Sequence, residues 1–196
     1  MTTRYVALLR GINVGGNNLI KMSALKACLE ALGMLNVSTY IASGNVLFDA
    51  PRASGAETGA KRERSDRGHE ARLARALETG LSKAFGYEAR LTLRSPEEMQ
   101  ALVKKAPKGF GKDAAKYRYD CIFLFEPLTA KEALPLVPQK EGVDQLWAGD
   151  RVLYSARLIA KVTSSRLNRI VGTKAYQSMT IRNWNTSSKL AALLAK

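Results

Sequence analysis

The feature that most constrains the fold of this chain is the order in which the spacing of its apolar residues changes. In the first half, segments with the two-residue alternation of a strand and segments with the three-and-four spacing of a helix follow the order strand, helix, strand, strand, helix, strand. The second half repeats that order. The sequence therefore predicts an α+β protein made of two ferredoxin-like (β-α-β-β-α-β) units with antiparallel sheets.

The first ferredoxin-like unit is expected to span residues 1–95. Leucines spaced by three and four residues predict its helices, and Gly33 is expected to end the first one because glycine readily adopts the left-handed conformation found there. Residues 51–68 are rich in Gly, Ala, Ser, Arg and Glu and lack an apolar period, so they are predicted to form a flexible insertion. The predicted strands and helices, in chain order, are residues 5–10, 25–32, 37–41, 46–48, 69–85 and 87–94.

Residues 96–117 are expected to connect the two units through a helix and a basic loop. Ser95 and Glu98 have the spacing of a capping box around Pro96, which suits the first turn of a helix. The second ferredoxin-like unit is expected to span residues 118–196 and to end in a basic helix. Its predicted strands are residues 119–125, 143–147, 151–154 and 179–182, and its predicted helices lie near residues 129–135, 167–171 and 190–194.

The central strands of both predicted sheets are apolar on both faces. Tyr5–Leu9 and Tyr119–Phe125 are nearly continuous apolar runs, whereas the expected edge strand at residues 37–41 alternates. A sheet face without helices would leave such residues in water, so we expect those faces to be covered, with the two sheets partly packed on each other.

The chain has a formal net charge of +14, and most of the excess lies in its last quarter. Residues 151–196 carry nine Lys and Arg residues and no Asp or Glu. Clustered positive charge attracts polyanions far better than dispersed charge, so this region indicates a phosphate-bearing partner such as nucleic acid. The nine cations are Arg151, Arg157, Lys161, Arg166, Arg169, Lys174, Arg182, Lys189 and Lys196.

Cysteine usage and hydropathy predict a soluble, cytoplasmic protein that does not bind membranes. The apolar run at Tyr5–Leu9 is far shorter than the roughly 20 residues of a bilayer-spanning helix. Cys28 and Cys121 form no CxxC motif and are expected to be buried free thiols in a reducing compartment. His69 is the single histidine and has no companions at metal-ligand spacing, so no metal or cofactor is expected.

A glycine-rich loop joins the first predicted strand to the first helix. Residues Arg10–Gly16 read RGINVGG, and Lys21 precedes the helix. Glycines permit positive φ angles, and backbone N–H groups at a helix start can bind an anion. The segment matches neither GxxxxGK[ST] nor GxGxxG, so a tight loop without a ligand is the alternative.

Two further segments combine groups that could bind a ligand. Ser43–Asn45 presents a hydroxyl and an amide at the turn of a hairpin, although these are also ordinary turn residues. Thr180–Trp184 places a guanidinium, an amide and an indole together at a strand-to-helix junction. Arg can bind phosphate and Trp can stack on a base, while Trp184 as a cover for the core is the alternative.

Catalytic residues are hard to identify in this sequence. There is no histidine beside a nucleophile and no close pair of carboxylates. Asp49 is the one carboxylate that could act as a base, and a role in capping a turn is the favoured alternative for it. An enzyme acting on a nucleotide or another phosphate ester at the same pocket remains an alternative, because phosphate chemistry relies mostly on positioning and electrostatics. A structural or interaction protein without an anion site is the second alternative.

Three segments resemble the bacterial family of unknown function DUF1697. They are ALLRGINVGGNNLIKM at residues 7–22, TYIASGNVLFD at 39–49, and SSRLNRIVGT with TIRNWNT at 164–173 and 180–186. The resemblance implies a cytoplasmic α+β protein of two ferredoxin-like pieces, and it implies no activity, cofactor or metal. Residues 51–68 depart from the family pattern by being longer and more charged.

The resemblance also raises the expectation of a site, because it rests on polar and loop residues more than on core positions. The glycine loop, the Ser43–Asn45 turn and the Arg182–Trp184 segment are expected to form one ligand-binding pocket. Its expected ligand-binding residues are Arg10, Gly11, Asn13, Gly15, Gly16, Lys21, Ser43, Asn45, Arg182, Asn183 and Trp184.

Overall fold

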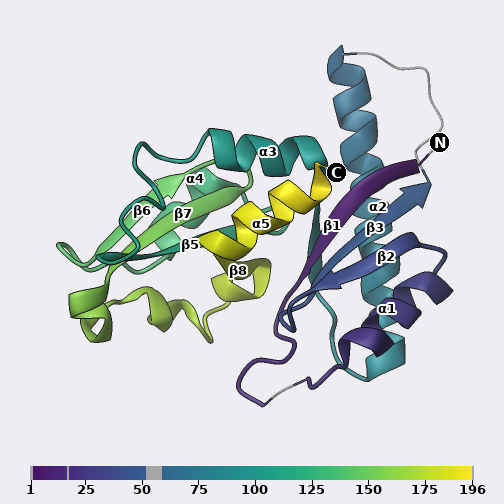
Figure 1. The fold of residues 1–196 in the computed structure, drawn as a ribbon, viewed down its shortest axis with the longest axis horizontal. Helices are drawn as coiled ribbons and strands as arrows, with labels where there is room; N and C mark the ends of the chain where they lie inside the picture. Colours follow the sequence, from purple (N-terminus) through teal and green to yellow (C-terminus); the bar gives the residue numbers. More distant parts are fainter. Residues whose placement is uncertain (1, 17, 52–58, 196) are drawn as a thin grey trace. The chain divides into compact units, whose positions relative to one another are not determined.

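The computed structural model describes residues 2–16, 18–51 and 59–195, and it divides the chain into two compact units (Figure 1). Unit 1 is Met1–Pro96 and unit 2 is Glu97–Lys196. Each contains a four-stranded sheet in which all paired strands are antiparallel. The predicted α+β class with two antiparallel sheets is confirmed. Among the described helices, none has both the length and the apolar character needed to cross a bilayer.

Unit 1 has the strand order β2-β3-β1-β4. Its central strand β1 pairs with β3 along its length, from Thr2 opposite Pro51 to Leu8 opposite Asn45, and with β4 near its C-terminal end. Gly33, at φ 87°, ends the first helix as expected. The elements are β1 (Thr2–Leu9), α1 (Met22–Ala31), β2 (Leu35–Tyr40), β3 (Asn45–Pro51), α2 (Gly59–Phe85) and β4 (Leu91–Arg94).

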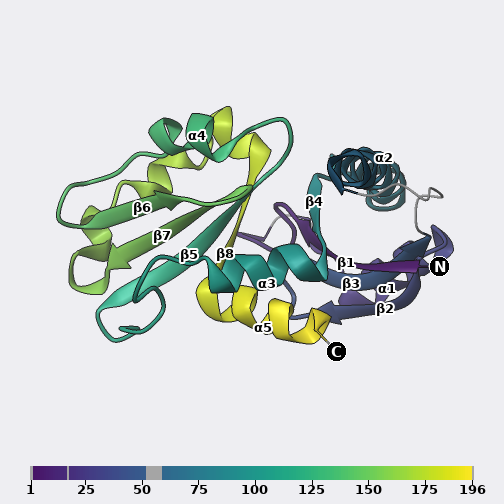
Figure 2. The same cartoon turned by 90° about the horizontal axis from the view of Figure 1, so that it is seen from above.

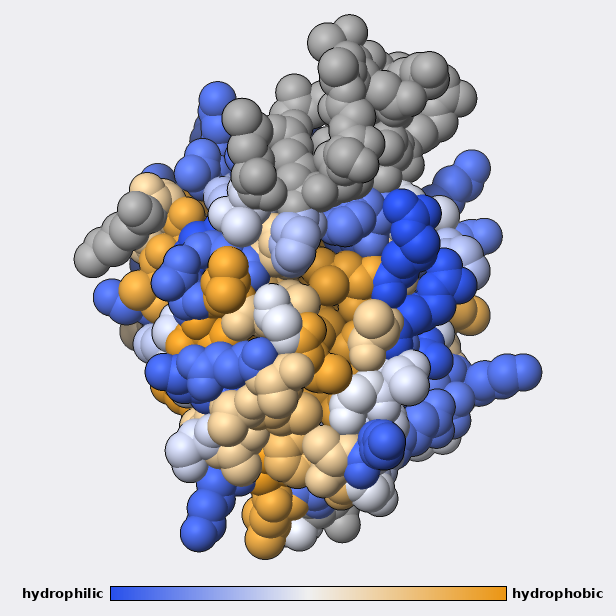
Figure 3. Space-filling model, turned by 90° about the vertical axis from the view of Figure 1, so that its right-hand side faces the viewer, coloured by the Kyte–Doolittle hydropathy of each residue, from blue (hydrophilic) through white to orange (hydrophobic). Residues whose placement is uncertain are grey.

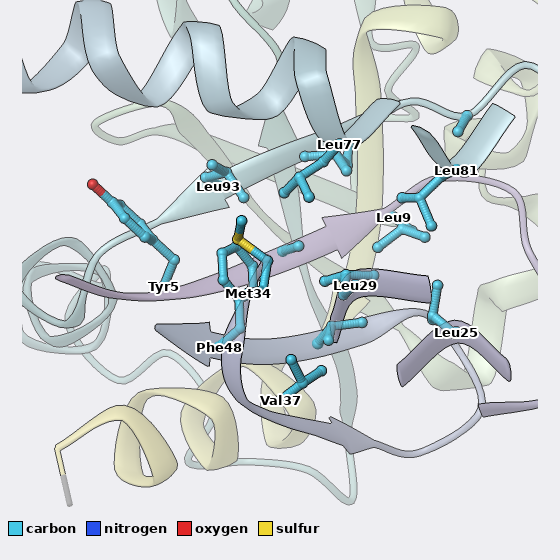
Figure 4. Close-up of a cluster of buried hydrophobic side chains, with 14 of the residues drawn as sticks. Tyr5, Leu9, Leu25, Leu29, Met34, Val37, Phe48, Leu77, Leu81 and Leu93 are labelled. Carbon is cyan, nitrogen blue, oxygen red and sulfur yellow. The ribbon is translucent and has the colours of Figure 1, made fainter. Parts of the chain in front are cut away.

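The core of unit 1 lies between one face of this sheet and both of its helices (Figure 4). Alternate residues of β1, such as Tyr5 and Leu9, point to the same face because side chains alternate along a strand. Figure 4 shows side chains of α1, α2 and the strands pointing toward one another. The labelled members are Tyr5, Leu9, Leu25, Leu29, Met34, Val37, Phe48, Leu77, Leu81 and Leu93.

Helix α2 begins at Gly59, well before the predicted start at His69. The prediction followed the apolar stripe, whose first member is Leu73, and residues 59–68 contribute nothing to that stripe. Six of these ten residues are Arg, Ala, Lys or Glu, three of them Arg, and these residue types favour helix through propensity alone. The expected insertion at 51–68 is therefore helical from Gly59 onward, and residues 52–58 lie outside the described part of the chain.

Several large apolar side chains of unit 1 are not part of this core and remain exposed. Figure 3 turns the side of Figure 1 that carries α1 and α2 toward the viewer, and hydrophobic residues form a band across it between hydrophilic ones. Exposed apolar area of this kind is characteristic of interaction surfaces. The exposed apolar residues of unit 1 are Val14, Leu19, Leu32, Leu35 and Ile41.

Unit 2 has the equivalent strand order, β6-β7-β5-β8, with β5 and β7 in the centre. Thr129 and Glu132 form a capping box at the start of the helix predicted near residues 129–135, and this helix changes to a 3-10 turn at Leu134–Leu136. The elements are α3 (Pro96–Lys104), β5 (Tyr117–Leu124), α4 (Ala130–Ala133), β6 (Asp144–Ala148), β7 (Val152–Leu158), the 3-10 helices Ile159–Ser164, Leu167–Ile170 and Ala175–Ser178, β8 (Met179–Asn183) and α5 (Trp184–Leu194).

Both faces of the unit 2 sheet are covered (Figure 2). Ile122 and Leu124 of β5 pack into a cluster with α4 and the 3-10 helices. Cys121, which points to the opposite face, hydrogen bonds with Ser187 of α5. Figure 2 shows α4 on one side of the sheet and α3 with α5 on the other. This arrangement explains why the strand is apolar on both faces.

Helix α3 belongs to unit 2 and is more than a connector. The hydroxyl of Tyr154 donates a hydrogen bond to the carbonyl of Leu102 at 2.7 Å, and Arg151 Nη1 lies 2.6 Å from Glu98 Oε1. Burial raises the pKa of Tyr154 to about 12, so this phenol remains a donor at neutral pH. The segment expected to connect the units, residues 96–117, contains α3 and the basic loop after it, and both group with unit 2.

The helix predicted near residues 167–171 is a short 3-10 helix, Leu167–Ile170, and further 3-10 helices lie at Ile159–Ser164 and Ala175–Ser178. The hydroxyls of Ser165 and Thr173 accept hydrogen bonds from nearby backbone N–H groups, which competes with continuous helix formation. Side chains of the sheet also hold the segment. Asp144 accepts from the Arg166 N–H at 2.9 Å, and Arg157 donates to the Asn168 side chain at 3.3 Å.

Candidate functional site

A hollow of about 420 Å³ lies within unit 2 where four segments meet. They are the loop after α3, the first residues of strand β5, the first 3-10 helix after β7, and the junction of β8 with α5. The residues that line it are Gly111, Ala114, Tyr117, Arg118, Tyr119, Ile159, Val162, Asn183, Trp184 and Asn185. Asn183 and Trp184 are thus two expected site residues that the structure places in a cavity.

Aromatic rings form a cluster around Phe110, behind the hollow. Phe110 is buried, and its ring centroid lies 4.8 Å from that of Tyr119, 5.3 Å from Tyr154 and 5.1 Å from Trp184, in edge-to-face geometry. Tyr117 and Tyr119 are two residues apart on β5, so they share a face of the sheet, with centroids 6.0 Å apart. Two walls of the hollow are therefore held in place by one buried ring.

Trp184 is the first residue of α5, and local contacts fix its position. Asn183 caps the helix by accepting a hydrogen bond from the Thr186 N–H at 2.7 Å. Gly111 lies against the indole: a Cβ at Gly111 would be 2.2 Å from Trp184 Nε1. Only a residue without a side chain leaves room for Trp184 here. The indole is half-buried, so it covers the aromatic cluster and also faces the hollow.

The third expected member of this segment, Arg182, is buried and does not line the hollow. Its guanidinium donates to the Thr180 hydroxyl at 2.8 Å and to the Ile181 carbonyl at 2.9 Å. Burial lowers the pKa of Arg182 to about 10, so it stays charged at neutral pH. Both of these hydrogen bonds are to residues of its own strand, and its role in ligand binding stays a prediction.

Arg118 carries positive charge at the edge of the hollow. Its side chain is 60% exposed, and its Nε lies 3.6 Å from Asp120 Oδ2. The same carboxylate oxygen lies 2.5 Å from a guanidinium nitrogen of the buried Arg157. Two guanidinium groups therefore share one carboxylate, so this trio retains one net positive charge.

The nine cations of residues 151–196 are not equivalent in the structure. Arg157 and Arg182 are buried, and Arg151 lies within 4 Å of both Glu98 and Glu126. Lys196 lies outside the described residues. The cations of this region with exposed side chains are Lys161, Arg166, Arg169, Lys174 and Lys189. Four of these five belong to residues 159–178, here named the basic 3-10 segment.

In unit 1, the glycine loop is organised by Asn13. This residue has a φ of 54°, donates to the carbonyls of Ile20 and Ala42 at 2.9 and 2.8 Å, and accepts from the Ile20 N–H at 2.8 Å. Its amide group is fully used in shaping the loop. Gly15 and Gly16 have φ angles of 61° and 80° and are exposed, so their backbone is open to solvent.

The Ser43–Asn45 turn lies against this loop. A Cβ at Gly44 would lie 2.8 Å from Ile12 Cδ1, and the Leu9 N–H donates to the Gly44 carbonyl at 2.9 Å. Asn45 is buried and donates to the Tyr40 carbonyl at 2.9 Å and to the Ser43 hydroxyl at 3.0 Å. The structure therefore brings the loop and the turn together at one end of the unit 1 sheet.

Lys21 and Arg10 flank the glycine loop. Lys21 is exposed and is the residue before α1, where its side chain makes no capping hydrogen bond. Arg10 is half-buried, and its N–H donates to the Arg90 carbonyl at 2.9 Å. Eight expected site residues thus belong to unit 1, and Arg182, Asn183 and Trp184 belong to unit 2. A single pocket made by both groups stays a prediction.

Tyr117, Arg118 and Tyr119 are site residues that sequence reasoning missed. The expected strand began at Tyr119, and the basic residues before it were assigned to a loop. The usable signal was the run Lys116-Tyr-Arg-Tyr119, in which aromatic and basic residues alternate. On a strand, this alternation places both rings on one face and the guanidinium on the other.

Asp49, the carboxylate considered as a base, accepts hydrogen bonds from neighbouring side chains of unit 1. Burial alone would raise the pKa of Asp49, but hydrogen bonds from Asn36 at 2.6 Å and Arg4 at 3.0 Å outweigh it and lower the pKa. A carboxylate with a lowered pKa is a weak base. In the described part of the chain, no three His, Cys, Asp or Glu side chains gather closely enough to hold a metal ion.

Comparisons with known proteins connect this chain to uncharacterised ones. A family model described as "Protein of unknown function (DUF1697)" matches residues 1–154. A solved structure described as the conserved bacterial protein SP0830 from Streptococcus pneumoniae is similar over 100% of both chains, with a TM-score of 0.80 and 26% sequence identity. No curated protein matches the chain. None of these descriptions names a ligand or a reaction.

Proposed function

Because this chain belongs to the DUF1697 family of proteins of unknown function, we propose its function from its own residues: it binds a phosphate-bearing ligand, and that ligand is nucleic acid. The observation that carries the proposal is the charge of unit 2. Residues 151–196 contain no acidic residue, while Lys161, Arg166, Arg169 and Lys174 are exposed on the basic 3-10 segment. Exposed cations of this kind attract a phosphate backbone and release its counterions.

A second basic segment supports the same conclusion. The loop between α3 and β5, named the basic loop here, covers residues 105–116 and has exposed lysines with Asp113 as its single acid. Residues from the basic loop and from the basic 3-10 segment line the same hollow, namely Ile159 and Val162 from the segment and Gly111 and Ala114 from the loop. Its lysines are Lys105, Lys108, Lys112 and Lys116.

The glycine loop is the proposed secondary phosphate contact. Its side-chain amide at Asn13 is used internally, so the exposed backbone of Gly15 and Gly16 and the Lys21 ammonium are the groups that it offers. Backbone N–H groups contact phosphates without reading base sequence. We therefore expect this loop to add affinity and little specificity.

We infer that both units are ferredoxin-like. The support is the strand order, in which the first and third strands of each unit are central and the second and fourth are at the edges. Unit 2 departs from the pattern because 3-10 helices replace its second helix. A cytoplasmic location is also proposed, since it provides access to nucleic acid and keeps the free thiols of Cys28 and Cys121 reduced.

Fluorescence anisotropy with a labelled, mixed-sequence RNA or DNA oligonucleotide tests the proposal. Binding should appear near 50 mM salt, and log affinity should fall linearly with log salt up to about 200 mM, because cations on the protein release counterions from the phosphates. A salt-independent affinity, or no binding even at the low salt concentration, would show that the proposed function is wrong.

A further inference from the structure

The hollow in unit 2 has features that a phosphate-binding surface alone does not need. Its volume of about 420 Å³ lies within the range of roughly 300–1,000 Å³ that small-ligand pockets occupy. Three of its lining residues are aromatic, namely Tyr117, Tyr119 and Trp184, and all three are half-buried, with part of each side chain accessible. Phosphate recognition requires donors and positive charge, so these rings point to a second kind of ligand group.

The rings are fixed before any ligand arrives. Phe110 packs edge-on against both Tyr119, at 4.8 Å, and Trp184, at 5.1 Å. Gly111 leaves room for the edge of the Trp184 indole, and its φ of 80° allows the loop to turn there. Rigid aromatic groups lose little conformational entropy on binding, so such walls bind a planar ligand at low entropic cost.

Cationic residues line the hollow or neighbour its lining residues in the sequence. Arg118 lines it and is largely exposed, and Lys116 Nζ lies 5.5 Å from the Tyr117 ring centroid. Lys112 adjoins Gly111, and Lys161 adjoins Val162. The arrangement is thus an aromatic cavity with cations at its margin, which is the combination that proteins use for single-stranded nucleic acids.

We propose that the hollow receives an unpaired base of a single-stranded nucleic acid, stacked on Tyr117, Tyr119 or Trp184, with the flanking phosphates on Lys112 and Lys116. This inference rests on the proposed function and narrows its substrate class. Asn183 and Asn185 line the same cavity, and since the Asn183 side-chain oxygen caps α5, Asn185 is the residue proposed to supply an amide for the edge of the base. A duplex hides the faces of its bases by stacking, so its bases do not enter the hollow.

The test compares three probes that carry about the same number of phosphates. They are a labelled single-stranded oligonucleotide, the same strand with abasic sites, and a duplex of half that length. At one salt concentration, the wild-type protein should bind the single strand most tightly. The variant Tyr117→Leu keeps apolar volume but removes the ring, and it should bind the single strand about tenfold more weakly while its affinity for the abasic strand is unchanged.

A matched control and a local signal accompany this measurement. Tyr87→Leu removes a half-buried tyrosine of unit 1 and should leave all three affinities unchanged. In a Trp147→Phe background, Trp184 is the only remaining indole, so its emission should change with the single strand and remain constant with the abasic strand.

The outcomes separate the two proposals. Equal affinity for all three probes, with no effect of Tyr117→Leu, would overturn the base-binding hollow and leave phosphate binding intact. Binding of free adenosine monophosphate as tight as that of the strand would assign the hollow to a mononucleotide and also overturn the single-strand proposal. Failure of every oligonucleotide to bind would overturn the proposed function itself.

Discussion

The two units share a strand order but differ in what connects the third strand to the fourth. In unit 1 this connection includes α2, Gly59–Phe85, whose leucines seal one core. In unit 2 it is the basic 3-10 segment, which is held by polar contacts from Asp144 and Arg157. A continuous helix devotes one face to the core, whereas short 3-10 turns leave most of their residues exposed. Unit 2 therefore has, in place of a second long helix, an exposed basic segment that lines part of a cavity.

The largest expected effect concerns the ion pairs that characterise each unit. Arg157→Ala should lower the free energy of unfolding by about 3–5 kcal/mol, because it leaves the buried Asp120 without its closest partner. Arg4→Ala removes the partly exposed partner of Asp49 in unit 1 and should cost less than about 1 kcal/mol. Urea unfolding monitored by circular dichroism measures both. Equal losses of unfolding free energy would show that the buried Arg157–Asp120 ion pair stabilises the protein no more than the partly exposed Arg4–Asp49 pair.

The second largest effect concerns the close contact between Gly111 of the basic loop and the Trp184 indole. Gly111→Ala should destabilise the protein by about 2 kcal/mol, because an alanine at φ 80° is strained and its Cβ also meets the Trp184 indole at 2.2 Å. Gly109→Ala is the matched control: its φ is 81°, and its Cβ would meet nothing within 4 Å. It should cost only about 1 kcal/mol. Trp184 emission should shift in the first variant alone, and the same shift in both would contradict the proposed contact.

The smallest effect tests an acidic residue of unit 1 by its pH dependence. The folded-state pKa of Asp49 is lowered, so its contribution to stability is present above its ordinary value of 3.8 and is lost as pH falls through the folded pKa. Asp49→Asn should therefore cost about 1 kcal/mol at neutral pH and much less near pH 3. Thermal unfolding of both proteins over this pH range gives the difference. A loss that is independent of pH would contradict the assignment.

The elements that the sequence predicted well are those with a clear apolar period or a local cap. The stripe at Leu25 and Leu29, the stop at Gly33 and the Thr129–Glu132 capping box all depend on neighbours within a few residues. Both sheets and their central strands followed from the same kind of signal. Such features are determined locally, so a single sequence contains enough information to find them.

The features that the sequence does not predict depend either on tertiary contacts or on helix propensity without an apolar pattern. The start of α2 depends on helix propensity without apolar residues, and the 3-10 segment depends on Asp144 and Arg157, which are distant in sequence. The sequence predicts only part of the lining of the hollow. Asn183 and Trp184 are among the expected site residues. The alternating run at Lys116–Tyr119 indicates a strand, but Tyr117 and Arg118 join the hollow only through the pairing of β5 with β8, which is a tertiary contact.

Two variants with the same charge loss test the central claim most directly. One replaces Lys161, Arg166, Arg169 and Lys174 of unit 2 by Gln, and the other replaces the exposed Lys26, Arg72, Arg75 and Lys83 of unit 1 by Gln. For one single-stranded oligonucleotide, the slope of log affinity against log salt should become clearly shallower for the unit 2 variant and stay near the wild-type value for the unit 1 variant. Equal slopes for the two variants would show that net charge alone, and not the basic 3-10 segment, attracts the ligand.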